Sequence, residues 1–145
     1  MKGRSQKMSP APDELIITSD FANLPRVEQF VARVSRKAGL TEDQSDNMAI
    51  AVTELVNNAI IHGNKEDPSK HVIIRARYLV DRVVVSVIDE GEGFDPTELP
   101  DPTDPANLWR ENGRGLFLVR QFIDEVEIHS SSQGTEIVLT EYLSS

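Results

Sequence analysis

The sequence predicts an α+β fold: one two-layer α/β sandwich whose mixed or antiparallel sheet carries helices on one face. Two stretches in the first half have apolar residues at steps of three and four, as amphipathic helices do. Four β-branched runs form two tight hairpins. The resulting order is β, α, α, β, β, loop, α, β, β, which lacks the strand–helix alternation of a doubly wound fold. A chain of 145 residues with 39% hydrophobic residues suits one such core.

Composition narrows the classes of function. The chain has no cysteine, which rules out disulfides and thiolate metal sites. Its net charge of −9 opposes binding to phosphate backbones and anionic lipids, so we expect neither nucleic acid nor membrane as the main partner. Residues 1–12 are basic and lack an apolar segment, and no apolar run is long enough to span a bilayer. We therefore expect a disordered arm over 1–12, one domain over 13–145, and a soluble cytoplasmic protein.

The first strand and the first helix come from residues 14–38. The run ELIIT at 14–18 is short and apolar, which favours an edge strand. A helix is predicted over 24–38, with Asn23 as its N-cap and Gly39 after its end. Its apolar positions are Val27, Phe30, Val31, Val34 and Ala38.

The second helix, over 46–64, carries both a core stripe and a polar pair. Thr41 and Gln44 form a capping-box pattern before it, and Gly63 ends it. Glu54 and Asn58 are four apart, so a carboxylate and an amide leave the same helix face. The apolar stripe on the other face consists of Met48, Val52, Leu55, Val56 and Ala59.

Two hairpins and a third helix complete the predicted fold. Residues 72–79 and 82–88 pair through a tight turn, and Val83, Val85 and Val87 alternate onto one face. Residues 113–123 fit a helix buried on one side. Strands at 126–130 and 135–140 form the second hairpin.

A long segment at 89–112 separates the third strand from the third helix. It contains four of the eight prolines, which exclude a continuous helix and favour a restrained flap, with a lid at about 94–114. Glycines flank it: Gly91 and Gly93 at one end, Gly113 and Gly115 at the other. Such glycines let the backbone approach a ligand closely, and the amides at a helix start can meet phosphate oxygens.

Asp89 ends a strand beside this segment. A carboxylate fixed there accepts a hydrogen bond from an exocyclic amine such as that of adenine, whereas guanine presents a carbonyl at that position. Each pattern alone is common, since a polar helix face is usually the solvent side of a helix and a DxGxG sequence is often an ordinary turn. Together and in this order, they indicate a nucleotide site.

The same residues resemble the GHKL, or Bergerat, ATP-binding fold of histidine kinases, gyrase B and MutL. The sequence ELVNNAIIHG resembles its N box, DEGEGFDP its G1 box and GRGLFLV its G2 box, and Gly134 with Thr135 resembles the last element on the adenine side. Within that superfamily, the chain is most similar to the anti-sigma-factor serine kinases of the RsbW and SpoIIAB kind.

The resemblance implies a role for each matching residue. It makes Asn58 the Mg²⁺ ligand, Asp89 the adenine contact and Glu54 the candidate general base. Asn57 beside Asn58 is an alternative ligand, although the spacing from Glu54 favours Asn58. The remaining residues of the implied ATP site are Gly91, Gly93, Gly113, Arg114, Gly115, Leu116 and Thr135, with Arg114 reaching toward the terminal phosphate.

The implied activity is ATP-dependent phosphorylation of a serine or threonine on an anti-anti-sigma protein of the STAS fold, together with sequestration of a sigma factor, commonly by a homodimer. An alternative is a non-catalytic, nucleotide-gated module that only binds a partner; such a module has no need of Glu54. A severed histidine-kinase domain ranks lowest, because no helical hairpin with a phosphoacceptor histidine precedes the ATP domain.

Overall fold

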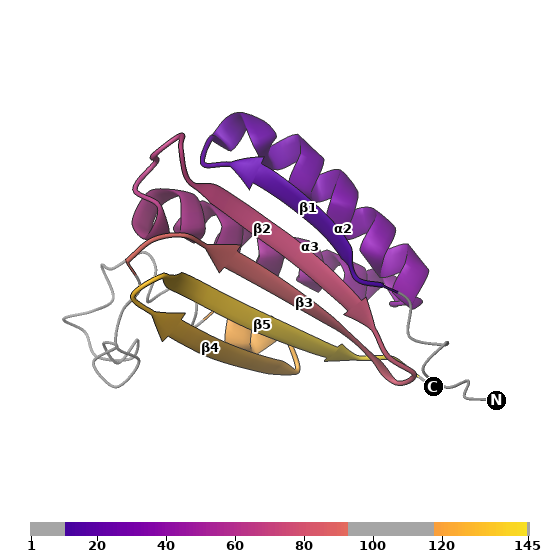
Figure 1. Ribbon diagram of the computed structural model, residues 1–145. Coiled ribbons are helices and arrows are strands. Elements are labelled where there is room, and N and C mark those ends of the chain that lie inside the picture. Colours follow the sequence, from indigo (N-terminus) through magenta and orange to yellow (C-terminus); the bar gives the residue numbers. More distant parts are fainter. Residues whose placement is uncertain (1–10, 93–117, 145) are drawn as a thin grey trace.

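A computed structural model describes residues 11–92 and 118–144 of the chain. Five strands form one sheet in the order β1-β2-β3-β5-β4, and every neighbouring pair is antiparallel. Helices α2 and α3 lie side by side behind this sheet (Figure 1). The α+β sandwich and the edge position of the first strand, both predicted from the sequence, are therefore confirmed. The strands are β1 (Asp13–Thr18), β2 (His71–Tyr78), β3 (Arg82–Asp89), β4 (Glu125–Ser131) and β5 (Gly134–Tyr142).

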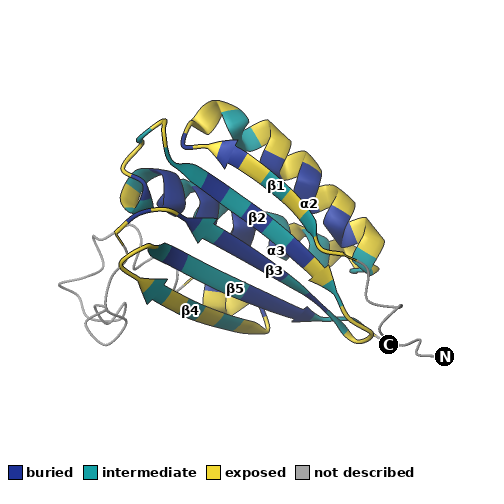
Figure 2. Ribbon diagram, viewed as in Figure 1, coloured by how far each residue is buried: buried dark blue, intermediate teal, exposed yellow. Residues whose placement is uncertain are grey.

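The core lies between the sheet and the helices. Along β3 the side chains alternate, and Val83, Val85 and Val87 are all buried, as their spacing predicted. Figure 2 shows the same alternation on β2, where buried residues follow one another at every second position. The opposite face of the sheet carries no helix among the described residues. One apolar layer therefore joins all five strands to the two helices.

Helix α2 (Leu24–Ala38) has the predicted bounds, and Gly39 follows it in the left-handed conformation with φ of 84°. Asn23 occupies the predicted N-cap position, but its side chain does not cap the helix. Asn23 ends a 3₁₀ turn, Phe21–Asn23, has helical backbone angles and makes no capping hydrogen bond. Its side-chain amide donates to Thr18 instead. Asp20 caps the 3₁₀ turn, so the helical path begins earlier than the sequence indicated.

Helix α3 (Glu42–Asn58) begins with the predicted capping box, in which Thr41 and Gln44 exchange hydrogen bonds. It does not end as an ordinary α-helix. The chain widens into a π turn, Ala59–Gly63, before it enters the loop at Asn64. Such turns are rare and occur frequently at functional sites. This one follows Asn58 directly, and its last residue, Gly63, packs against Asp89 at the end of β3.

The third predicted helix is described in part. Residues 118–122 are helical, and Val119 and Ile123 are buried in the core. Residues 113–117 and the predicted lid at 94–114 lie outside the described residues. Within the described ranges, none of the helices has the length and apolar character needed to cross a bilayer.

Candidate functional site

Asp89 is the last residue of β3, and only 8% of it is exposed. Its Oδ1 atom accepts two backbone hydrogen bonds, one from the N–H of Gly91 at 2.9 Å and one from the N–H of Thr135 at 3.2 Å. Thr135 is 46 positions away and belongs to β5. The carboxylate therefore holds together the ends of two neighbouring strands, as expected for a group fixed where a strand ends.

The second oxygen of this carboxylate has a different environment. Among the described residues, the hydrogen bonds to Asp89 reach Oδ1 only. Burial raises the pKa of Asp89, while the two backbone hydrogen bonds and the charge of Lys70 act in the opposite direction. Oδ2 packs beside Gly63 and has no hydrogen-bond donor among the described residues, so it can accept an N–H group supplied by a ligand.

Two glycines bring the end of the π turn against Asp89. A Cβ atom on Gly63 would lie 2.6 Å from Cγ of Asp89, and one on Gly91 would lie 2.6 Å from the carbonyl carbon of Gly63. Real Cβ atoms essentially never come so close to another atom, so only glycine allows these approaches. The sequence predicted Gly91 as a nucleotide-loop residue, but it predicted Gly63 only as a helix end. The close approach of Gly63 depends on a tertiary contact that no local pattern reveals.

The last turn of α3 carries the other predicted residues. Asn58 is 8% exposed, and its Oδ1 atom is buried without a hydrogen-bond partner among the described residues. The same is true of Oδ1 of Asn57, although Asn57 as a residue is only partly buried. Glu54, one turn earlier, is also partly buried. Hydrogen bonding thus leaves both amides as candidate ligands, while helical spacing places Asn58 on the face of Glu54.

These features fit a nucleotide with a divalent cation. Buried polar atoms are normally satisfied, so an orphaned amide oxygen calls for a partner such as a hydrated ion. The described residues contain no group of three His, Cys, Asp or Glu side chains able to hold a metal. An ion at Asn58 would therefore take most of its ligands from phosphates and water, which is how Mg²⁺ is commonly bound.

Five predicted site residues lie outside the described residues. One is Gly93, just beyond the first described range, and the other four come from the stretch that resembles the G2 box: Gly113, Arg114, Gly115 and Leu116. The described part of the candidate site thus consists of the end of the sheet around Asp89 and the α3 face.

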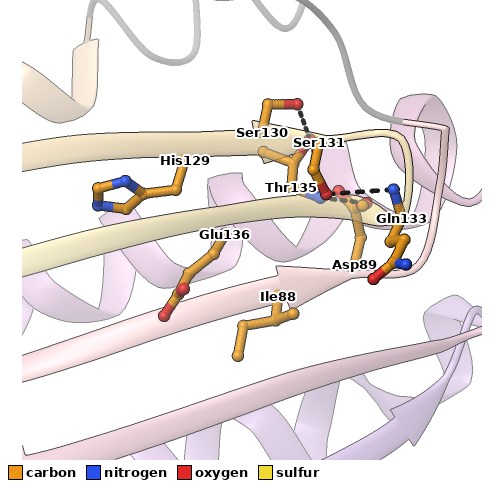
Figure 3. A pocket seen from close by; sticks show the side chains of 9 residues that line it. Ile88, Asp89, His129, Ser130, Ser131, Gln133, Thr135 and Glu136 are labelled. Carbon is orange, nitrogen blue, oxygen red and sulfur yellow. Dashed lines mark hydrogen bonds between the residues drawn. The ribbon is translucent and has the colours of Figure 1, made fainter.

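A shallow hollow of about 280 Å³ lies beside Asp89 at the β4–β5 hairpin (Figure 3). Thr135 lines it, with its hydroxyl 3.0 Å from that of Ser130. His129, Glu136 and Ile88 are cross-strand neighbours whose alternation places them on the face of the sheet without helices. The hollow therefore opens partly on that face and reaches Asp89 and Thr135 at the end of the sheet.

We predict that Gly91→Ala disturbs the site through its backbone. The added methyl group meets the carbonyl of Gly63, so the two segments must separate, at a cost of about 1–3 kcal/mol in the free energy of unfolding. The Asp89 carboxylate should turn as well, which shifts the amide resonance of Thr135. Urea unfolding and NMR spectra of labelled protein measure the two effects.

Gly39→Ala is the matched control. A Cβ at Gly39 meets no atom within 4 Å, but φ there is +84°, so the substitution costs about 1 kcal/mol from the backbone alone. It should leave the Thr135 amide resonance unchanged. Equal shifts of that resonance in both variants would contradict the proposed packing around Asp89.

Comparisons with known proteins agree with this arrangement. The model of the histidine kinase-like ATPase domain family matches residues 17–141. The serine-protein kinase RsbW of Bacillus subtilis (strain 168) is 34% identical over 116 residues, which cover 76% of this chain and 72% of that protein.

Solved structures share the fold. A crystal structure of the RsbU and RsbW domains of a Mycobacterium tuberculosis protein has a TM-score of 0.67 at 21% identity, over 94% of this chain and 33% of that one. The mycobacterial sensor histidine kinase MprB has a TM-score of 0.54 at 16% identity, over 91% of this chain and 97% of that one. Taken with the family match, they confirm the predicted fold type. The chain belongs to the histidine kinase-like ATPase domain family, and within it to the relatives of the RsbW serine-protein kinases.

Proposed function

We propose that the protein is an ATP-dependent serine/threonine kinase that acts as an anti-sigma factor. In this proposal it phosphorylates an anti-anti-sigma protein of the STAS fold and sequesters a sigma factor. The observation that carries the proposal is the buried Asp89 carboxylate, held by two backbone N–H groups at the end of β3, in a chain related to serine-protein kinases.

Asp89 has the properties needed to recognise adenine. Both hydrogen bonds to Oδ1 come from rigid backbone, so the direction of Oδ2 is fixed. A fixed acceptor favours the 6-amino group of adenine and disfavours a 6-oxo purine, which would place one acceptor against another. The match to an ATPase domain family supports ATP as the nucleotide.

The residues of α3 have the properties needed on the phosphate side. Asn58 offers its orphaned amide oxygen to Mg²⁺. The ion, when bound, neutralises charge on the phosphate oxygens. Glu54, four residues earlier, is the candidate general base that accepts the proton of the attacking hydroxyl. A module that only binds a partner does not need this carboxylate, so Glu54 favours the kinase over the non-catalytic alternative.

The proposal is tested by affinity capture from the native lysate, with and without Mg-ATP. We expect a STAS-domain protein and a sigma factor among the captured proteins. Incubation of that STAS protein with the pure protein and γ-labelled ATP should then label a serine or threonine. Capture of a STAS protein that receives no label would contradict the kinase proposal and favour the nucleotide-gated binder.

The adenine contact gives a prediction about Asp89→Asn. The amide can keep the Oδ1 acceptor but turns a donor toward the amine, so ADP binding should fall by tenfold or more while the fold remains. Burial raises the pKa of Asp89 in the folded state. The fold is therefore more stable while this carboxyl is protonated, and it loses that contribution to the free energy of unfolding as pH rises through the raised pKa. The variant should therefore be at least as stable as the natural protein at pH 7. Calorimetric titration and urea unfolding measure the two quantities.

Asp81→Asn is the control, because Asp81 is an exposed carboxylate in the turn at the opposite end of β3. It should leave the ADP affinity unchanged. In the natural protein, that affinity should weaken as pH falls through the raised pKa of Asp89, above the usual range near 4. An Asp89→Asn variant that binds ADP normally would remove Asp89 from the site.

The chemical step gives a prediction about Glu54→Gln. The amide keeps the shape of the side chain but cannot take a proton, so phosphotransfer should fall by about 10² or more while Mg-ATP binding stays within about tenfold. Single-turnover transfer to the STAS protein measures the rate. Glu42→Gln, at the exposed start of the same helix, is the matched control and should transfer phosphate normally.

Asn58→Ala should behave in the opposite way. Loss of the candidate ion ligand should weaken Mg-dependent nucleotide binding itself, and Asn57→Ala should do so much less if Asn58 is the ligand. A normal rate for Glu54→Gln would remove the general-base role. An Asn57→Ala variant with the larger loss of Mg-dependent binding would instead assign the ion to Asn57.

A further inference from the structure

Asn64 is a buried polar residue that the proposed chemistry does not use. It is the first residue after the π turn, and 1% of it is exposed. We propose that Asn64 is a positioning residue, which fixes the direction of the Asp89 carboxylate and thereby sharpens the choice of 6-amino over 6-oxo purines. This inference rests on the proposed adenine contact of Asp89.

The side-chain amide of Asn64 joins three segments that are far apart in the sequence. Its Oδ1 accepts a hydrogen bond from the N–H of Glu90 at 2.8 Å. Its Nδ2 donates to Oγ of Ser19 and to the carbonyl of His71, both at 2.9 Å. Both donor hydrogens and an acceptor lone pair are used. The end of β1, the start of β2 and the residue after β3 are thus tied to one side chain.

This network fixes the orientation of the amide. The hydroxyl of Ser19 donates to the carbonyl of Lys70 at 2.8 Å, so its oxygen must accept from Asn64. The carbonyl of His71 also requires a donor, and the N–H of Glu90 requires an acceptor. Rotating the amide by 180° would break all three bonds at once. An aspartate at this position would lose both donors and place an oxygen against a carbonyl.

The backbone around Asn64 is held in an unusual conformation. Its N–H donates to the carbonyl of Ala59, and the N–H of Glu66 donates to the carbonyl of Ile60, both at 2.7 Å. Lys65 and Glu66 follow with positive φ angles of 53° and 57°. Non-glycine residues adopt such angles only where the surrounding structure enforces them. The buried amide of Asn64 is the group in the right place to enforce this turn.

Asn64 acts on Asp89 from both sides. On one side, Oδ1 of Asn64 accepts a hydrogen bond from the N–H of Glu90, the residue that directly follows Asp89 in the chain. Gly63, which directly precedes Asn64, packs against the carboxylate, and its carbonyl packs against Gly91, whose N–H is bonded to Oδ1. A single amide therefore locks the two segments that meet at Asp89. Without it, these segments can separate and the carboxylate can turn toward water.

A carboxylate that can turn selects purines less well. Discrimination against a 6-oxo group depends on the acceptor being unable to move away from it. Removing Asn64 should therefore weaken ADP binding more than binding of inosine diphosphate (IDP), the matching 6-oxo nucleotide. A side chain that merely stabilises the fold would change both affinities by the same factor. The ratio of the two dissociation constants separates the two roles.

The test measures the Kd of ADP and of IDP by calorimetry for the full chain and for Asn64→Ala. We expect the Kd of ADP to rise tenfold or more and the preference for ADP over IDP to fall at least fivefold. Gln44→Ala is the matched control, because it also removes a hydrogen-bonded amide. Gln44 bonds to the carbonyl of Tyr142, opposite Arg82 at the other end of β3, roughly 23 Å away. It should leave the preference for ADP within twofold.

Two further measurements cover the case in which Asn64→Ala does not fold. Ser19→Ala removes only one anchor of the amide, and it should lower the preference for ADP two- to threefold. The second measurement is hydrogen exchange of the Glu90 backbone N–H, followed by NMR without nucleotide. In Asn64→Ala and in Ser19→Ala, if folded, this exchange should accelerate tenfold or more, because Asn64 no longer holds the N–H firmly. Unchanged preference in Ser19→Ala, with normal exchange at Glu90, would overturn the proposal.

The outcomes separate this inference from the proposed function. If the natural protein prefers ADP, and Asp89→Asn abolishes the preference while folded Asn64→Ala retains it, Asn64 is not a positioning residue and the adenine contact stands. If the natural protein binds ADP and IDP equally, the proposed contact of Asp89 and the role of Asn64 both fail.

Discussion

The structure depends on one close approach, that of the end of the π turn to the end of β3. Gly63 packs directly on the carboxylate of Asp89, and Gly91 packs on the carbonyl of Gly63. Because no side chain separates these segments, the last helical residues and the last strand residue share one rigid frame. Residues on α3 and on the sheet then keep a fixed relation, which a site assembled from both layers needs.

The two ends of the sheet are stabilised in different ways. At one end, the amide of Gln44 bonds to the carbonyl of Tyr142, and the capping box starts α3. At the other end, Asn64 holds three chain segments by a network in which each donor has an acceptor. Oγ of Ser35 on α2 is one of three buried side-chain oxygens without a hydrogen-bond partner among the described residues, and the other two, on Asn57 and Asn58, lie in the last turn of α3, which leads into the π turn before Asn64. Such atoms are costly in an empty fold and useful in a liganded one, so their position at a braced end is physically consistent.

Electrostatics constrain how this protein can hold an anionic nucleotide. The chain carries a net charge of −9, and Asp89, the proposed adenine contact, is itself a carboxylate. Burial raises the pKa of Asp89 because the charged form is poorly solvated there, while the two backbone hydrogen bonds oppose this shift. In the proposed function, Asp89 recognises the base, and neutralisation of the phosphates falls to an ion at Asn58 and to backbone amides.

The sequence by itself determined the elements and the family. Amphipathic spacing located α2 and α3, alternation located the buried face of β3, and the Thr41–Gln44 pattern located a helix start, because these signals act between residues a few positions apart. It also selected Asp89, Asn58 and Glu54 as candidates by chemistry and spacing. The missed cap near Asn23 reflects a local 3₁₀ turn, capped by Asp20, that the helical pattern did not reveal. Only the tertiary structure decided the contacts of Gly63 and Asn64. Asn64 meets Ser19 across 45 positions and Glu90 across 26, and Asp89 meets Thr135 across 46. Bonds of that span leave no local pattern, so the fold had to place these groups together before their roles could be inferred.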